Sequence, residues 1–300
     1  MTTVQQPARG LFNRRRNGTA PPGRAHDVMA YGERPWLRIW SAVVFLLLYL
    51  PLGILILFSF NDSKRNIVWQ GFTTEYYGKA LRDETLIEAF VNSLTIATIS
   101  TLVSTILGTF AAVTLWRFRF PMRPLYEGLV TLPIVIPEIC MGVAMMTFFE
   151  SIGWPEKLPW PLVLGKITLA HIAFSFPFVC IIVRARLVGF NRELEEASKD
   201  LGASEWQTLR HVVMPYLMPG IVAGALIGFV LSLDDFVITF FTSGPNSVTL
   251  PIKIFSMIRF GVSPAINAAS TALIVVSITA TLLALWIYRP DRAEQAVKDE

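Results

Sequence analysis

The chain has 300 residues, of which 53% are hydrophobic and only 16% are charged, and its mean hydropathy is +0.52. About a quarter of the residues in a soluble globular domain are charged, so this composition argues against one, and it also excludes an intrinsically disordered chain. The formal net charge of +4 would suit nucleic acid only if the basic residues formed one contiguous surface. They are instead distributed between apolar runs, so no nucleic-acid binding is predicted.

Residues 1–36 are rich in Arg, Pro and Gly and lack a periodic apolar pattern, which predicts a flexible basic tail. Residues 37–289 are predicted to form one transmembrane domain. Its six predicted spans lie at about residues 37–60, 90–116, 126–149, 167–186, 216–241 and 264–288. Each can cross roughly 30 Å of hydrocarbon at a helical rise of about 1.5 Å per residue. We therefore expect an all-α polytopic membrane protein in contact with lipid.

The orientation follows from the basic residues in the connections. With the N-terminus inside, the inner segments hold 18 Lys and Arg residues and the outer segments hold 8. Basic connections tend to stay in the cytoplasm, so both termini are predicted to be cytoplasmic, including the C-terminal tail at residues 290–300.

The third predicted span contains a helix break. Pro133 and Pro137 precede Glu138, and proline removes a backbone hydrogen bond and kinks or breaks a helix. Glu138 lies ten residues past Gly128, or about 15 Å along a helix, which places it near mid-bilayer. A carboxylate at a broken membrane helix is typical of transporter sites. A purely structural role for Glu138 is the alternative.

Other chemistry-bearing residues are isolated. His171 lies inside the fourth span, where an ionisable residue is a functional candidate, although a lone histidine is more often a hydrogen-bonded packing residue. Cys140 and Cys180 sit in apolar stretches and indicate neither a disulfide framework nor a metal site. The chain lacks a P-loop, a His-Glu-x-x-His motif and a Gly-x-Ser-x-Gly motif, so we predict no enzymatic activity, no catalytic residues and no bound metal.

The connection at residues 187–213 is longer than most loops of helical bundles. A first helix is predicted there, with Asn191 at its start, Gly202 at its stop, and apolar residues at helical spacing: Phe190, Leu194, Ala197 and Leu201. A second short helix is predicted from about Ser204 to Val213, ending before Pro215. Because the polar side of the first helix is acidic, it suits a partner protein better than anionic lipid. An amphipathic helix lying on the membrane surface is the alternative.

The fifth predicted span contains the second acidic cluster, Asp234 and Asp235. Buried carboxylates are costly unless they are paired or hydrated, and neither this span nor the third contains Lys or Arg. Cations from partner chains, protonation, or an aqueous path used by a cationic substrate would each resolve the cost. The alternative is that the two residues cap the outer end of a short helix.

Residues Glu196-Ala197-Ser198, Gly202 and Val212-Val213-Met214-Pro215 resemble the "EAA" signature of binding-protein-dependent ABC importer permeases, E-A-A-x3-G-x9-I-x-L-P. The spacing matches in full, and Ser198, Val212 and Met214 are substitutions of small or similar volume. The likeness to the spermidine/putrescine permease branch extends from about residue 40 to 288. It is carried by residues 58–61, 69–73, 231–235, 243–245, 250–256 and 261–268.

This resemblance implies a type I ABC importer permease (MetI-like) fold in the bacterial inner membrane. It also implies a heterodimer with a second permease, a dimeric cytoplasmic ATPase that binds the ATP, an extracytoplasmic solute-binding protein, and no cofactor bound by this chain. The implied coupling helix would contact the ATPase through seven residues: Glu196, Ala197, Ser198, Asp200, Leu201, Gly202 and Ala203.

The sequence thus predicts a polyamine permease subunit in which Glu138, Asp234 and Asp235 line the substrate path. Two alternatives remain. One is an ABC permease for another cargo, such as iron, an opine, a phosphonate or another organic cation. The other is a stand-alone cation channel or carrier, which the EAA spacing disfavours.

Overall fold

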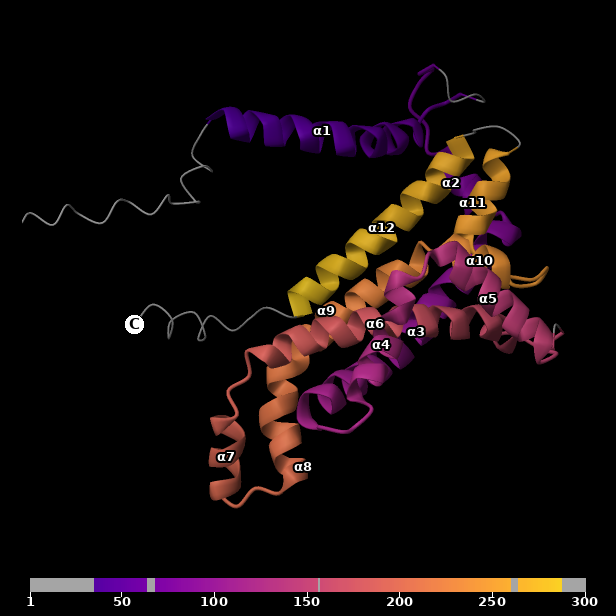
Figure 1. The fold of residues 1–300 in the computed structure, drawn as a ribbon. Helices are drawn as coiled ribbons and strands as arrows, with labels where there is room; N and C mark the ends of the chain where they lie inside the picture. Colours follow the sequence, from indigo (N-terminus) through magenta and orange to yellow (C-terminus); the bar gives the residue numbers. More distant parts are fainter. Residues whose placement is uncertain (1–34, 64–67, 156, 260–263, 288–300) are drawn as a thin grey trace, which may run out of the picture. The chain divides into compact units, whose positions relative to one another are not determined.

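The computed structural model describes residues 35–63, 68–155, 157–259 and 264–287 (Figure 1). The predicted tails therefore lie outside the described residues, apart from residues 35 and 36. The chain divides into two compact units, Met1–Ile54 and Leu55–Glu300. Helix α1 (Pro35–Phe58) supplies the described part of the first unit and continues into the start of the second.

The described residues are almost entirely helical, and the predicted all-α class is confirmed. Five of their helices are long and apolar enough to cross a membrane, or six if one bent pair counts as a single span. The helices of the second unit that carry these spans are α3 (Glu84–Arg117), α4 (Arg123–Val135), α5 (Glu138–Ser151), α6 (Gly165–Val188), α9 (Met214–Leu233) and α12 (Pro264–Ile287). Shorter helices are α2 (Glu75–Ala80), α7 (Glu193–Asp200), α8 (Glu205–Thr208), α10 (Val237–Thr242) and α11 (Leu250–Ile258).

Helices α3, α6 and α9 pack against one another in the centre of the second unit (Figure 1). Val179 of α6 lies between glycines of the other two helices. A Cβ atom at Gly108 of α3 would lie 2.7 Å from Val179 Cβ, and one at Gly224 of α9 would lie 3.0 Å from Val179 Cγ1. Small residues let membrane helices approach closely. Because the hydrophobic effect does not drive helix association within lipid, van der Waals packing at such close contacts stabilises it instead. These glycines therefore determine how closely the three helices can pack.

Helix α3 starts where the chain supplies a strong cap. The Asp83 carboxylate accepts hydrogen bonds from the backbone N–H groups of Thr85 and Leu86, at 3.0 and 3.2 Å. The Thr85 hydroxyl also donates to it, at 2.7 Å. These bonds satisfy donors that a helix N-terminus leaves without partners.

The third predicted span, 126–149, is two helices rather than one. Helices α4 and α5 meet at an angle of 107°. Ile136, between them, has extended backbone with φ −71° and ψ 130°, because a residue before proline is pushed out of the helical region. The predicted break therefore occurs at Pro137, and α5 begins directly at Glu138.

The fifth span differs from the prediction at both ends. The expected helix end before Pro215 is wrong, because α8, a π turn at Leu209–Val213 and α9 form one helix from Glu205 to Leu233. Proline in a helix lacks a donor and crowds the carbonyl four residues back, and the wider π turn ahead of Pro215 accommodates both defects. At the other end α9 stops at Leu233, so the stretch 216–241 is interrupted before α10.

Two stretches that carry the family resemblance meet in the second unit, after α1. Asn61 and Phe72 form an isolated antiparallel bridge. The buried Asn61 side chain donates to the Val68 carbonyl and accepts from the Gln70 N–H, both at 2.9 Å. The amide thus holds the residues around it in a closed turn.

Candidate coupling surface and translocation site

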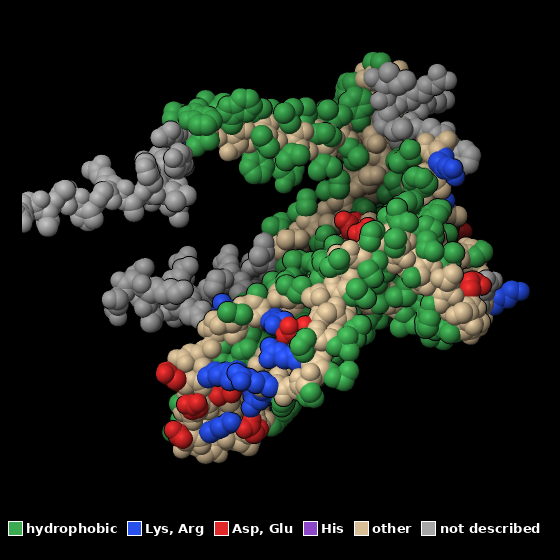
Figure 2. Space-filling model, in the orientation of Figure 1, with side chains coloured by type: hydrophobic (Ala, Val, Ile, Leu, Met, Phe, Trp, Pro, Cys, Tyr) green, Lys and Arg blue, Asp and Glu red, His purple; other side chains and the backbone are tan. Residues whose placement is uncertain are grey.

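Most of the charged side chains on the visible face gather at one end of the second unit, over α7 and α8, while hydrophobic side chains cover much of the rest and only a few charges are scattered there (Figure 2). Because charged groups avoid the hydrocarbon of a membrane, this end is the part of the described chain best suited to water and to a water-soluble partner.

The turn between α7 and α8 has the geometry expected from its sequence. Gly202 has φ +85°, a left-handed conformation that favours glycine. Its N–H donates to the Lys199 carbonyl at 2.8 Å, and the Ala203 N–H donates to the Ser198 carbonyl at 3.1 Å. The predicted helix stop at Gly202 is therefore confirmed. Asn191 accepts the Glu193 N–H at 3.0 Å, so its side chain satisfies a donor at the start of α7.

The exposed face of α7 mixes acidic and apolar side chains. Glu196, Ala197 and Asp200 are exposed, and Leu201 is 90% exposed. Of the four apolar residues at helical spacing, only Phe190 is buried; Leu194, Ala197 and Leu201 are exposed. Trp206 of α8 adds a second large exposed apolar side chain. Exposed apolar groups rimmed by charges are typical of a protein-docking surface.

Ion pairs join this surface to the end of α3. Arg117 Nη1 lies 3.1 Å from Glu195 Oε1 of α7, and Arg117 also pairs with Glu205 of α8. Lys199 Nζ contacts Glu205 Oε1 at 2.5 Å. The Lys199 hydrogen bond and the nearby Arg117 charge lower the pKa of Glu205. This link is not predicted from the sequence, in which Arg117 is one of the basic residues that indicate the orientation and carries no mark of its partners.

Aromatic contacts reinforce the same junction. The Arg192 guanidinium lies 4.9 Å from the centroid of the Trp116 ring, and the Phe190 ring packs edge-on against Trp116 at 5.5 Å. Phe190 also contacts the Tyr216 ring of α9 at 5.0 Å. The connection is thus attached to both α3 and α9.

The second candidate site lies where the two interrupted spans meet. Helices α5 and α10 pack together through a shared apolar cluster that includes Met141, Phe174 and Ile238. Glu138, at the start of α5, and Asp234, directly after α9, are both exposed. Asp234 precedes the start of α10 by three residues, so both carboxylates lie near the starts of two helices that pack together. Neither carboxylate takes part in an ion pair with any residue that the structure describes.

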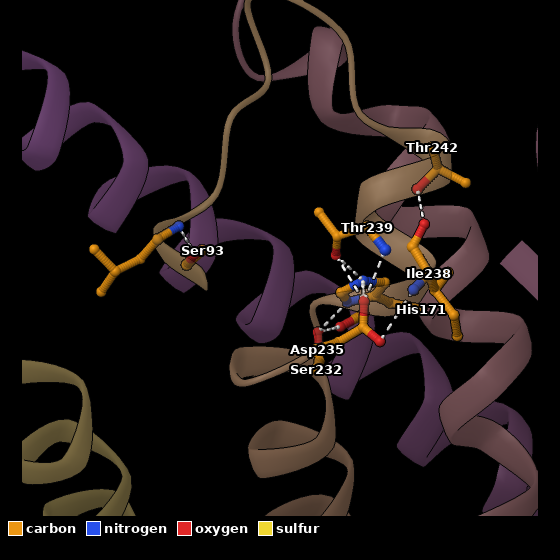
Figure 3. A network of polar contacts seen from close by, with 9 residues as sticks. Ser93, His171, Ser232, Asp235, Ile238, Thr239 and Thr242 are labelled. Atoms are coloured by element: carbon orange, nitrogen blue, oxygen red, sulfur yellow. Dashed lines mark hydrogen bonds and ion pairs between the residues drawn. The ribbon is translucent and has the colours of Figure 1, made fainter. Parts of the chain in front are cut away.

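Asp235 is placed differently from its neighbour. Its side chain is only 5% exposed and lies 3.2 Å from His171 Nε2. Its carboxylate accepts the Thr239 N–H and hydroxyl, both at 2.8 Å, and the Ile238 N–H at 3.4 Å (Figure 3). Asp235 therefore caps the start of α10 and faces the protein interior, so the structure brings Glu138 and Asp234 together and separates Asp235 from them.

In the sequence His171 is an isolated residue, but in the structure it contacts Asp235, which caps the start of α10. Its Nδ1 lies 2.7 Å from Ser232 Oγ and its Nε2 lies 2.9 Å from Thr239 Oγ1, so the hydrogen-bonded packing role fits. The third and fifth predicted spans contain no Lys or Arg, so a basic partner for Asp235 had to come from another span. This absence was the signal that could have pointed to His171. Within the described residues, no group of three or more His, Cys, Asp or Glu could hold a metal ion.

Comparison with known proteins identifies the class. Residues 104–289 match the family described as "Binding-protein-dependent transport system inner membrane component", and the chain belongs to this family. It is a multi-pass membrane permease rather than an enzyme.

Two relatives from Escherichia coli (strain K12) specify the branch. The spermidine/putrescine transport system permease protein PotC is 39% identical over 252 residues, which cover 83% of this chain and 92% of PotC. The putrescine transport system permease protein PotI is 37% identical over 268 residues, which cover 88% of this chain and 94% of PotI. The predicted resemblance to polyamine permeases is confirmed.

Solved structures share the fold. A bacterial alginate ABC transporter in complex with alginate pentasaccharide-bound periplasmic protein matches with a TM-score of 0.66 and 18% identity, covering 87% of this chain and 97% of that chain. The MetNI methionine ABC transporter in an inward-facing conformation matches with a TM-score of 0.58 and 19% identity, covering 68% and 97%. The predicted ABC importer permease fold is confirmed.

Proposed function

We propose that this chain is a transmembrane subunit of an ATP-driven importer of putrescine or spermidine, located in the bacterial inner membrane with both termini in the cytoplasm. The observation that carries the proposal is the 39% identity to a spermidine/putrescine permease across 92% of that relative's length. A second permease, a pair of cytoplasmic ATPases and an extracytoplasmic binding protein complete the transporter.

The α7–α8 surface is the docking site for the ATPase. The exposed Glu196, Ala197 and Asp200, together with the 90% exposed Leu201, lie directly before the Gly202 turn. Apolar side chains provide buried area on docking and the acidic side chains provide specificity. Movement of this surface reaches α3 through Arg117 and α9 through the continuous α8–α9 helix.

The exposed Glu138 and Asp234 guide the substrate. Polyamines carry several ammonium groups along a flexible chain, and two carboxylates without ion-pair partners suit them. A substrate must leave as well as enter, so several weak contacts serve transport better than one tight site. Both carboxylates lie at interrupted helices, as is common at transporter sites. Asp235, which the sequence also assigned to the path, supports Asp234 from behind.

Uptake of radiolabelled spermidine by cells that carry the complete transporter tests the pathway. We expect Glu138→Gln and Asp234→Asn each to reduce uptake and the double variant to reduce it further, with unchanged amounts of assembled complex. Glu75→Gln, which alters an exposed α2 carboxylate paired with Lys79, is the matched control. Unchanged uptake in the double variant would contradict the assignment.

Competition identifies the cargo. Unlabelled putrescine and spermidine should suppress labelled uptake, whereas ferric iron, an opine and a phosphonate should not. Suppression by one of these three, with no effect of polyamines, would replace the polyamine assignment by another cargo.

Co-purification with the ATPase tests the docking surface. Glu196→Lys combined with Gly202→Asp reverses a charge and strains the positive-φ position, so less ATPase should be recovered and transport should fall. Glu75→Lys is the control for charge reversal. An unaltered recovery of ATPase would count against docking at α7.

A further inference from the structure

A buried polar network joins four helices next to the exposed carboxylates. His171 comes from α6, Ser232 from α9, Thr239 from α10 and Ser100 from α3, and Asp235 lies between α9 and α10 (Figure 3). The side chains of His171 and Asp235 are 3% and 5% exposed. The network is therefore shielded from any substrate, although it lies one residue from Asp234.

The hydrogen bonds run in one direction through the network. Thr239 Oγ1 donates its proton to Asp235 at 2.8 Å, so the Nε2–H of His171 faces only acceptors, namely the carboxylate and the threonine oxygen. On the other side of the ring, Ser232 Oγ lies 2.7 Å from Nδ1, and Ser100 Oγ lies 2.9 Å from Ser232 Oγ. Ser232 can donate to Nδ1, and Nε2 can donate to Asp235.

Asp235 does not need its contact with the His171 imidazole in order to cap α10. Asp235 already accepts two backbone N–H groups, from Ile238 and Thr239, and this pair of bonds is what an N-cap needs. The contact from His171 instead joins the α9–α10 break to a different helix, α6. A buried polar group that is fully bonded makes its surroundings rigid, so the added bond fixes where the break lies relative to α6.

Fixing Asp235 also fixes Asp234. The two residues are adjacent, yet one carboxylate is buried and the other is exposed, near the start of α10, which packs against α5, the helix that begins at Glu138. A functional group is held in place by neighbours whose own positions are fixed by packing and hydrogen bonds. With Asp235 held by His171, the backbone at Asp234 cannot turn and carry its side chain to another position without breaking the buried contact between His171 and Asp235.

We propose that His171 is a positioning residue whose Nε2 contact with Asp235 fixes the break between α9 and α10 and so holds the Asp234 carboxylate beside Glu138 for a cationic substrate. This inference rests on the proposed function, because it requires that Asp234 contact the substrate. In this proposal the contact of Nε2 with Asp235 supports transport, whereas the contact of Nδ1 with Ser232 serves only packing.

Two amide substitutions separate the two sides of the ring. The amide nitrogen of Gln lies near the position of Nε2, so His171→Gln retains a donor for Asp235. The shorter Asn reaches only the Nδ1 position, so His171→Asn retains the Ser232 contact and loses Asp235. Spermidine uptake by His171→Asn should fall about tenfold, the change that corresponds to one lost bond to a charged group, while His171→Gln stays within about twofold of wild type.

Two further variants serve as controls. Ser232→Ala removes the Nδ1 partner and should behave like His171→Gln. Thr242→Ala removes a hydroxyl that donates to the Ile238 carbonyl within α10 and touches neither Asp235 nor His171, so it should leave uptake unchanged. Equal losses in His171→Asn and His171→Gln would overturn the proposal.

A double-mutant cycle with Asp234→Asn distinguishes positioning from general damage to the fold. If His171 acts through Asp234, His171→Asn should add no further loss in the Asp234→Asn background. Independent losses would overturn the inference while leaving the pathway assignment intact. Normal uptake by Asp234→Asn alone would instead overturn the pathway, and the inference with it.

Asp235→Asn covers the case in which His171→Asn fails to assemble. It retains one oxygen, which can accept the shorter of the two cap bonds, from the Thr239 N–H, and it removes the charge that faces the imidazole. We expect a loss of about tenfold that is also absent in the Asp234→Asn background. Full activity of an assembled Asp235→Asn transporter would overturn the proposal.

Discussion

Arg117 should couple the proposed ATPase-binding surface to the membrane helices, and its removal provides the sharpest test of the proposed coupling mechanism. Arg117→Gln keeps a polar side chain but removes the charge that joins the end of α3 to Glu195 of α7 and Glu205 of α8. We expect ATP hydrolysis to continue while spermidine uptake falls, because the docking helix would then move without pulling α3.

The ion pairs that Arg117 forms with Glu195 and with Glu205 should contribute different free energies, because the two carboxylates differ in exposure. The Glu195 side chain is only 13% exposed, and a charge-assisted hydrogen bond of this kind contributes about 1.5–3 kcal/mol. Glu205 is 65% exposed and keeps Lys199 as a partner, so solvent screens its pair with Arg117 and that pair contributes much less than the pair with Glu195. Loss of the Glu195 pair should therefore lower transport per ATP hydrolysed by at least about tenfold.

Reconstituted vesicles allow uptake and ATP hydrolysis to be measured in the same sample. Glu195→Gln should reproduce the Arg117→Gln defect, the combination of the two should be no worse than either, and Glu205→Gln should have a small effect. The charge exchange of Arg117→Glu with Glu195→Arg should restore part of the coupling. An unchanged ratio of uptake to hydrolysis in Arg117→Gln, or a larger effect of Glu205→Gln than of Glu195→Gln, would refute the reasoning.

Two further predictions concern stability and can be checked by thermal unfolding of the purified protein in detergent. Gly108→Ala places a Cβ atom 2.7 Å from Val179 Cβ and should lower the free energy of unfolding by about 1–3 kcal/mol. Gly228→Ala, whose nearest neighbour would be 3.8 Å away, should be tolerated, and equal losses in the two variants would contradict the packing argument. Asp83→Ala removes the cap of α3 and should cost about 1 kcal/mol at neutral pH. The Thr85 hydroxyl and the backbone N–H groups lower the pKa of Asp83. The contribution of Asp83 to the free energy of unfolding is therefore complete above the ordinary carboxyl pKa of about 4 and is lost as the pH falls through the lowered pKa. A difference in stability between the wild type and Asp83→Ala that grows in acid would contradict this.

Much of the fold could be predicted because the physics is local. An apolar run long enough to cross a bilayer must form a helix there, since unpaired backbone groups are too costly in lipid. The break at Pro137 follows from one residue and its neighbour. The turn at Gly202 follows from the left-handed conformation that glycine tolerates.

The remainder depends on which elements pack together. His171 and Asp235 are far apart in the sequence, and only the packing of α6 against α9 and α10 brings them together. The amphipathic pattern of α7 identifies an apolar face, but it does not show that Leu201 on that face is left exposed. Pro215 would ordinarily end a helix, and the π turn that prevents this has no clear sequence signature.

The helix from Glu205 to Leu233 has 29 residues, so at the helical rise it is a rod about 43 Å long. One end lies in the ATPase-docking region and the residue after the other end is Asp234. If the rod pivots at the π turn near its docking end, roughly 33 Å of helix lies beyond the pivot, and a tilt of about 5° would displace the far end by about 3 Å, from the length given by the helical rise. That displacement is about the length of a hydrogen bond. Because α6 packs along α9 and His171 of α6 holds the α9–α10 break, we expect the two helices to tilt together. A small rotation at the docking end is then enough to bring the Asp234 carboxylate to a bound ammonium group or to withdraw it.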